Sequence, residues 1–246
     1  MTRLALPPRP VGRAAAAALA VALAASACDP SEKGAGERPP TPAPAPTATT
    51  AQAPGGTAAA SASDTTSRAR ADRSRIRGDS AAPVWLVMVS DFQCPYCRMW
   101  HDSTYATLDR EYVRTGKVRM AYLNYPLPSH KHAWPAAEAS MCAGVQGKFW
   151  EMHSLIFDTQ AEWTPLPSAE AFFDSLATRV GANATELRQC VRSGAMRGLV
   201  QADMDRSSAS GVSSTPTFIV GDSVIEGAHP TERFRRVLDA AIRGGA

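Results

Sequence analysis

Large apolar residues are unevenly distributed along this chain, and the change falls near residue 76. Between residues 29 and 76 the sequence consists mainly of Pro, Ala, Thr, Ser, Gly and charged residues, with almost no large apolar side chain. A segment of this composition cannot bury enough apolar surface to fold. We therefore predict a disordered linker over residues 28–76 and a folded domain over residues 77–246.

Two apolar segments at the start of the folded domain predict neighbouring strands. Residues 84–90 are almost continuously apolar, as in a strand buried on both faces, and residues 117–123 alternate in polarity. A helical pattern over residues 98–114 lies between them. Because a helix that links two strands of one sheet normally crosses over, this order predicts a parallel pair.

A long helical block follows, and it contains no strand pattern. Ser168 and Asn183 are candidate N-caps within it, and Asn183 with Glu186 has the spacing of a capping box. This block is predicted to be an insert over about residues 130–211. Its expected helices cover residues 132–147, 149–160, 168–180, 184–193 and 195–211.

Strand patterns return near the C-terminus. Residues 217–220 and 223–226 flank Gly221-Asp222, which predicts a two-residue hairpin turn, and an amphipathic helix is predicted over residues 230–243. Without the helical insert, the remaining elements form a small four-stranded α/β fold. The predicted fold class is therefore α/β with an inserted all-helical subdomain.

The first 27 residues have the pattern of an export signal. Three arginines precede an apolar stretch over residues 14–25 that is too short to span a bilayer comfortably. Ala25-Ser26-Ala27 before Cys28 resembles a bacterial lipobox, which implies lipidation of Cys28 and a membrane anchor. The alternative is an ordinary signal that is cut after Ala27. Both predict an exported protein in the cell envelope or periplasm, where disulfides persist.

Removal of the signal makes the chain neutral. Residues 1–27 hold three of the 26 Lys and Arg residues and none of the 23 acidic ones, so 23 of each sign remain. The charge balance therefore gives no reason to expect a nucleic-acid partner.

The strand over residues 84–90 is followed by Cys94-Pro95-Tyr96-Cys97, directly before the first helix. A C-x-x-C at such a junction predicts a dithiol/disulfide redox site. With Cys94 as the first helical residue, Cys97 lies one turn on, and the N–H groups and dipole of the helix favour the Cys94 thiolate. Pro95 suits a first helical turn. We predict an exposed, attacking Cys94 and a deeper Cys97.

Two other interpretations of the motif are a zinc half-site and an inert structural disulfide. Zinc usually requires a second cysteine pair or nearby histidines, and the sequence has no second C-x-x-C. Haem attachment requires a histidine where Arg98 stands. We therefore predict redox chemistry without a metal or another cofactor.

Cys142 and Cys190 are the remaining cysteines. In an oxidising compartment they are predicted to bond to each other, which stabilises a loop of this length by about 4 kcal/mol in the chain-entropy model. Two separate buried thiols are the alternative.

Four stretches together resemble the DsbA-type thiol:disulfide oxidoreductases, which have a thioredoxin fold with an inserted helical domain. The stretches are residues 90–97, 139–143, 146–153 and 211–218. The resemblance implies a cis bond between Thr215 and Pro216, a loop that lies against the cysteine pair, and binding of an extended substrate beside Cys94. It also implies exported Cys-containing substrates and a membrane partner that reoxidises the dithiol. We expect a monomer, because the linker cannot build a dimerisation domain.

The direction of electron flow stays open at this stage. Strong oxidases of the family often carry His where Tyr96 stands, so a reductase or isomerase of the same fold is an alternative. A non-catalytic exported binding module with structural disulfides is another. Asp91 is either a buried proton acceptor or a solvated or capping carboxylate, His130 and His132 are assigned to the surface, and His153 to packing or hydrogen bonding.

Overall fold

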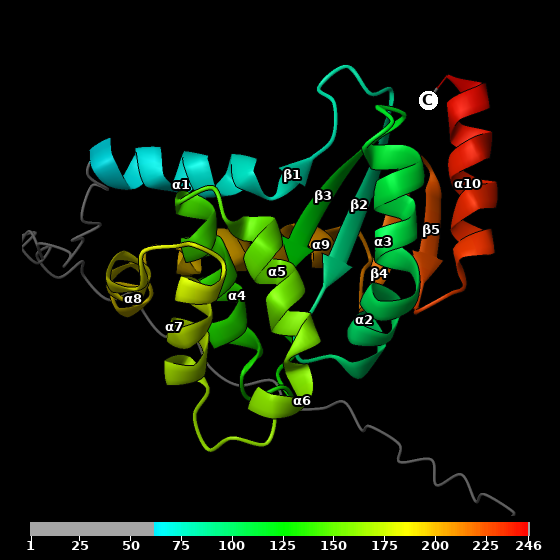
Figure 1. Cartoon of the computed structure of the whole chain (residues 1–246). Coiled ribbons are helices and arrows are strands. Elements are labelled where there is room, and N and C mark those ends of the chain that lie inside the picture. Colours follow the sequence, from blue (N-terminus) through cyan, green and yellow to red (C-terminus); the bar gives the residue numbers. More distant parts are fainter. Residues whose placement is uncertain (1–61, 246) are drawn as a thin grey trace, which may run out of the picture. The chain divides into compact units, whose positions relative to one another are not determined.

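The computed structural model describes residues 62–245, so the export signal, Cys28 and most of the predicted linker lie outside the described residues (Figure 1). The predicted end of the linker is wrong. Helix α1 (Ala62–Ser74) belongs to the fold, Ala71 is fully buried, and Arg68 Nε donates to the carbonyl of Ala195 at 3.1 Å. Polar contacts and small residues hold α1 in place. The helix therefore needs no apolar face, and the hydrophobic pattern of the sequence did not predict it.

The described strands form one sheet in the order β1-β3-β2-β4-β5. β2 (Val84–Ser90) and β3 (Val118–Asn124) pair in parallel, as predicted, and β4 (Thr217–Val220) with β5 (Ser223–Glu226) forms the predicted hairpin. The sheet has a fifth strand that was missed. β1 (Ile76–Arg77) pairs antiparallel with β3 and is two residues long, too short to show a periodic pattern.

The helix after the cysteine motif is present as predicted, but it begins three residues earlier, at Pro95, ends at Val113 and contains two π-helical stretches. Its parts are α2 (Pro95–Trp100), η1 (His101–Tyr105), α3 (Ala106–Leu108) and η2 (Asp109–Val113). π-helical turns inside α-helices are rare and occur often near functional sites. Here they follow the redox motif directly.

The predicted helical block lies between β3 and β4 in the chain. Its helices are α4 (Ala133–Val145), α5 (Phe149–Asp158), α6 (Gln160–Trp163), α7 (Glu170–Arg179), α8 (Ala184–Arg192) and α9 (Arg197–Ala209). Asn183 caps α8, as predicted, by accepting the N–H groups of Thr185 and Glu186. Ser168 is not a cap, because α7 begins at Glu170 after Ala169.

An aromatic cluster fixes the base of α2 on the sheet. The ring centroids of Trp100 and Phe218 lie 4.5 Å apart, and Phe234 of the final helix α10 (Thr231–Gly244) lies 4.8 Å from Phe218. All three side chains are buried. The C-terminal end of α2, at Trp100, therefore packs on β4 and α10. None of the helices in residues 62–245 combines the length and apolarity needed to cross a membrane.

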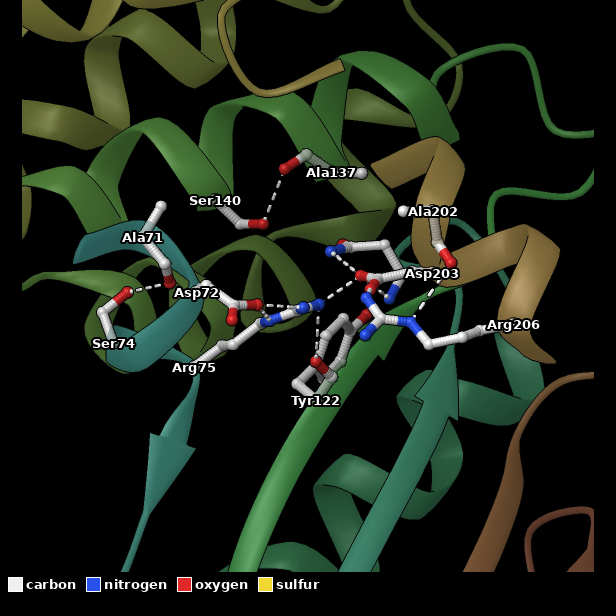
Figure 2. A network of polar contacts seen from close by, with 11 residues as sticks. Ala71, Asp72, Ser74, Arg75, Tyr122, Ala137, Ser140, Ala202, Asp203 and Arg206 are labelled. Carbon is white, nitrogen blue, oxygen red and sulfur yellow. Dashed lines mark hydrogen bonds and ion pairs between the residues drawn. The ribbon is translucent and has the colours of Figure 1, made fainter. Parts of the chain in front are cut away.

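A buried polar network joins α1, α9 and β3 (Figure 2). Arg75 is ion-paired with Asp203, and both are almost fully buried. Asp203 also accepts the backbone N–H of Asn124 at 3.1 Å and a bond from Arg206 at 2.8 Å, while Arg75 donates to the carbonyl of Tyr122 at 3.2 Å. The charges are thus paired as buried charges must be, and the end of α1 is fixed to β3, which pairs with β2 in the sheet.

Candidate active site

Cys94 and Cys97 are free thiols at the junction of β2 and α2. Cys94 is the N-cap residue, with φ −67° and ψ 125°, and Pro95 occupies the first turn. The prediction of an exposed Cys94 is wrong, since 3% of Cys94 and 2% of Cys97 is exposed. Cys94 is covered because its thiol donates to the carbonyl of Thr215, with Sγ and O 3.4 Å apart.

The two thiols differ in acidity. The pKa of Cys94 is lowered to about 6, first by a hydrogen bond from the Cys97 thiol, against the opposing effect of burial, with smaller contributions from the Thr215 side chain and from the N–H groups of Cys97 and Tyr96. Burial, and next the bond to Cys94, raises the pKa of Cys97 well above its usual value. Near neutral pH one thiolate is therefore favoured, and it is the Cys94 thiolate.

The Thr215–Pro216 peptide bond is cis, as the resemblance implied, and the loop lies against Cys94. Thr215 is buried, and the carbonyl of Pro216 accepts the N–H of Gly227 at 2.7 Å. The loop is thereby tied to the end of the β4–β5 hairpin. Its carbonyl at Thr215 points at the sulfur that has the lower pKa.

Asp91 is buried, which agrees with the first of the two environments predicted for it and excludes a solvated carboxylate. Its carboxylate accepts the N–H of Gln93 at 2.7 Å, the N–H of Leu127 at 2.8 Å and a bond with His130 Nδ1 at 2.6 Å. Burial raises the pKa of Asp91, while these bonds act in the opposite direction. The assignment of His130 and His132 to the surface is therefore wrong: the His130 side chain is 20% exposed and faces Asp91, and His132 is only 3% exposed.

The helical region contacts the motif through two glutamines that sequence reasoning missed. Gln160 donates through Nε2 to the carbonyls of Phe92 at 2.7 Å and Cys94 at 3.1 Å. Gln93 accepts the N–H of His132 through Oε1 at 2.6 Å. A neutral amide carries no pattern that marks it in a sequence, so these contacts emerge only from the fold.

The surface beside the motif combines exposed apolar side chains with polar groups. Tyr96 is 60% and Met99 is 52% exposed, on the first turns of α2. Next to them lies a depression of about 530 Å³. Its lining residues are Pro95, Arg98, Met99, Asp102, Ser103 and Gln160. Exposed apolar residues next to a reactive sulfur are typical of a surface that binds polypeptide.

His153 packs among aromatic rings, in line with its predicted role. It is fully buried, and Phe92, Tyr122 and Phe157 meet its ring edge-to-face at centroid distances of 5.1–5.7 Å. Burial lowers the pKa of His153 well below its usual value, so the ring is neutral.

One group in the described part of the chain has donor atoms close enough to hold a metal ion: His101, Asp102 and Asp158. Arg98 donates to Asp102 at 3.4 Å, and the buried Nε2 of His101 has no hydrogen-bond partner. Metal-binding histidines normally donate their other N–H to an acceptor, so this group is a poor metal site.

Cys142 and Cys190 form a disulfide between α4 and α8, as predicted, with 5.8 Å between their Cα atoms. This pair lies within the helical region. It has no part in the contacts around Cys94 and Cys97.

Comparison with known proteins gives consistent findings. The sequence model of the family described as Thioredoxin matches residues 70–240. The chain is 34% identical over 176 residues to the Na(+)/H(+) antiporter NhaA 1 of Salinispora arenicola, covering 70% of this chain and 25% of the antiporter. It thus spans about a quarter of the length of that relative. It is also 21% identical over 174 residues to the disulfide bond formation protein D of Bacillus subtilis, covering 69% and 77% of the two chains.

Solved structures show the same fold. Oxidised BdbD from Bacillus subtilis superposes with a TM-score of 0.63 at 21% identity and covers 69% of this chain and 93% of its own. The α-DsbA1 protein of Wolbachia pipientis gives a TM-score of 0.63 at 19% identity, with 70% and 92% covered. At these identities the likeness establishes the architecture, and the chemistry has to be argued from the residues in this chain.

Proposed function

The chain belongs to the thioredoxin family and has a DsbA-like fold, and from this premise we propose that it is an extracytoplasmic thiol:disulfide oxidoreductase that introduces disulfides into exported proteins. The observation that carries the proposal is the contrast between the thiols, with a Cys94 pKa of about 6 beside a Cys97 pKa well above its usual value. A pair polarised in this way favours the reduced enzyme, which makes its disulfide form an oxidant.

The reaction is a two-step exchange. With Cys94 and Cys97 joined as a disulfide, a substrate thiolate attacks Cys94 Sγ, the bond to Cys97 breaks, and Cys97 leaves as a thiolate that takes up a proton. A second substrate thiolate then attacks the substrate sulfur of the mixed disulfide. Cys94 leaves as a thiolate, the substrate gains a disulfide, and the enzyme gains two electrons. The low pKa of Cys94 speeds the second step because a stable thiolate is a good leaving group.

The cis-proline loop supports this reaction by position. The Thr215 carbonyl contacts Cys94 Sγ at 3.4 Å, so the loop borders the path by which a substrate reaches the sulfur. We assign Thr215 and Pro216 to binding an extended substrate segment through backbone groups. Cys94 is buried beside this loop in the dithiol form, so an incoming segment reaches the sulfur only where the loop gives way. Tyr96 and Met99 offer apolar surface for the same segment.

The cellular setting is part of the proposal. The signal-like residues 1–27 and the lipobox-like Cys28 support export with attachment to a membrane. The reduced enzyme needs an electron acceptor, and a membrane protein that reoxidises dithiols is the partner class that fits an anchored location. The antiporter relative supports membrane association of such domains, because that protein carries a similar segment within a membrane transporter.

The test is a redox titration of the Cys94–Cys97 couple against glutathione, with Cys142 and Cys190 still bonded. An oxidase equilibrates near the more oxidising end of the range that runs from about −120 to about −270 mV in proteins of this fold. A value near the reducing end contradicts the oxidase proposal and supports a reductase. Refolding of a reduced test protein, measured in parallel, shows whether the disulfide form transfers its bond at all.

A further inference from the structure

Asp91 contacts both cysteines of the motif through its backbone. Its N–H donates to Cys97 Sγ at 3.5 Å, and its carbonyl accepts the N–H of Cys94 at 3.1 Å. A displacement of this one residue therefore changes a hydrogen bond at each cysteine. The position of Asp91 is in turn set by its side chain.

That side chain is anchored on a different segment of the chain. The carboxylate is 0% exposed and bonds with Leu127 N–H and His130 Nδ1, both in the connection between β3 and α4. A buried carboxylate is strongly destabilised unless it has donors or a cationic partner. His130 is the titratable residue that bonds with it.

His130 has access to solvent, whereas Asp91 does not. The His130 side chain is 20% exposed, so its ring can exchange protons with the solution. Nδ1 can donate to Asp91 in the neutral and the charged ring, so the contact survives titration while the net charge of the pair changes.

The charged groups around the pair are few. On the motif side, Asp91 faces His130. On the same connection, Lys131 donates to the carbonyl of Pro167 and His132 bonds with the carbonyl of Leu166, so both are engaged elsewhere. The charge next to Asp91 is thus governed by His130 within the described residues.

We propose that Asp91 and His130 form a positioning pair that sets the oxidising strength of the Cys94–Cys97 couple and makes it depend on pH. The proposal rests on the function proposed above and goes beyond it. With His130 charged, the pair is neutral and leaves the Cys94 thiolate undisturbed. With His130 neutral, the Asp91 anion remains uncompensated near the sulfurs, disfavours the thiolate and weakens the oxidant.

The decisive variant is His130→Asn, whose amide can replace the Nδ1 donor but cannot become charged. Two glutathione thiols reduce the Cys94–Cys97 disulfide and leave as glutathione disulfide, and the equilibrium constant of this exchange is measured at pH 6.5 and at pH 9 on the full chain. We expect the wild-type constant to exceed that of the variant by about threefold at pH 6.5 and by less than about 1.5-fold at pH 9. His229→Asn, at a histidine outside the site, should match the wild type at both pH values.

A second measurement uses the wild-type protein alone. If His130 biases the couple, reduction must in turn bias His130, so the pH at which its ring protons titrate by NMR moves upward on reduction. An equal ratio at both pH values, or a titration that ignores the redox state, overturns the proposal. A strongly reducing couple would instead overturn the oxidase function while leaving the ratio between the two proteins measurable.

Discussion

The chain carries two cysteine pairs in very different surroundings. Cys94 and Cys97 are free, lie at a strand–helix junction and are surrounded by polar groups that separate their acidities. Cys142 and Cys190 are 48 residues apart, are bonded to each other and join two helices. Both pairs are largely covered by protein, so solvent exposure does not distinguish reactive from structural cysteines in this molecule.

The distinguishing feature is the set of hydrogen bonds around each sulfur. Cys94 accepts hydrogen bonds from the Cys97 thiol and from the N–H groups of Cys97 and Tyr96, which lower its pKa, whereas burial raises the pKa of Cys97. The structural pair is held by helix packing, with Cys142 in the middle of α4. Reactivity thus follows from local polarity at the start of a helix, and stability follows from a long closed loop. Four experiments test this difference between the two cysteine pairs.

The largest effect is expected from Cys94→Ala. Without the attacking sulfur no mixed disulfide forms, so the rate of oxidative refolding of a reduced test protein should fall by about 1,000-fold, to the uncatalysed level. Its unfolding free energy in urea should stay within about 1 kcal/mol of that of the reduced wild type. Residual catalysis in this variant would mean that the chemistry lies outside the motif.

Replacing both Cys142 and Cys190 by Ala should lower the stability and leave the exchange activity almost unchanged, which is the reverse of the effect of Cys94→Ala. The loss of a closed loop of 48 residues should lower the free energy of unfolding by about 4 kcal/mol, measured in urea by circular dichroism. Exchange activity per folded molecule should change by less than about twofold, because this pair makes no contact with the motif. A large loss of activity in the folded variant would show that the pairs are coupled.

Stability of the reduced protein should depend on pH through Cys94. The folded-state pKa of about 6 lies below the ordinary thiol value of 9.0, so the thiolate contributes stability that is fully present above pH 9 and is lost as pH falls through 6. Relative to Cys94→Ser, the reduced wild type should therefore gain about 1 kcal/mol between pH 5 and pH 7. Urea unfolding at the two pH values checks this, and a difference of opposite sign would contradict the assigned acidity.

The smallest effect concerns α8, the helix that carries Cys190. Asn183→Ala removes the cap that accepts the N–H groups of Thr185 and Glu186, which should cost about 1 kcal/mol of unfolding free energy. Ser168→Ala is the matched control, since Ser168 does not cap α7, and it should cost less than about 0.5 kcal/mol. Equal losses would remove the distinction between the two positions.

The strands, the motif and the final hairpin could be predicted because each has a local signal. β2 is a continuous apolar run, and Gly221 has a positive φ of 54° in the turn where a glycine was expected. The cis bond before Pro216 came from family resemblance, since no local pattern in a sequence fixes that isomer. Elements with a strong periodic or chemical signature can thus be predicted from the sequence alone.

The errors at α1, β1, His130 and Cys94 share a physical origin, because each concerns a contact between distant segments. α1 docks by polar contacts, and β1 has only two residues. His130 is separated from Asp91 by 39 positions, and Cys94 from Thr215 by 121. Burial of Cys94 and recruitment of His130 follow from the chain folding back on the motif, which spacing along the sequence does not encode.

The way α1 is fastened has a mechanical consequence. A Cβ atom at Gly144 would lie 2.4 Å from Ser74 Oγ, so α1 rests directly on α4, and Arg75 locks its end to Asp203. A pull on the start of α1 is therefore resisted by α4, α9 and β3, whereas α2, next to the cysteine pair, lies on another side of the molecule (Figure 1).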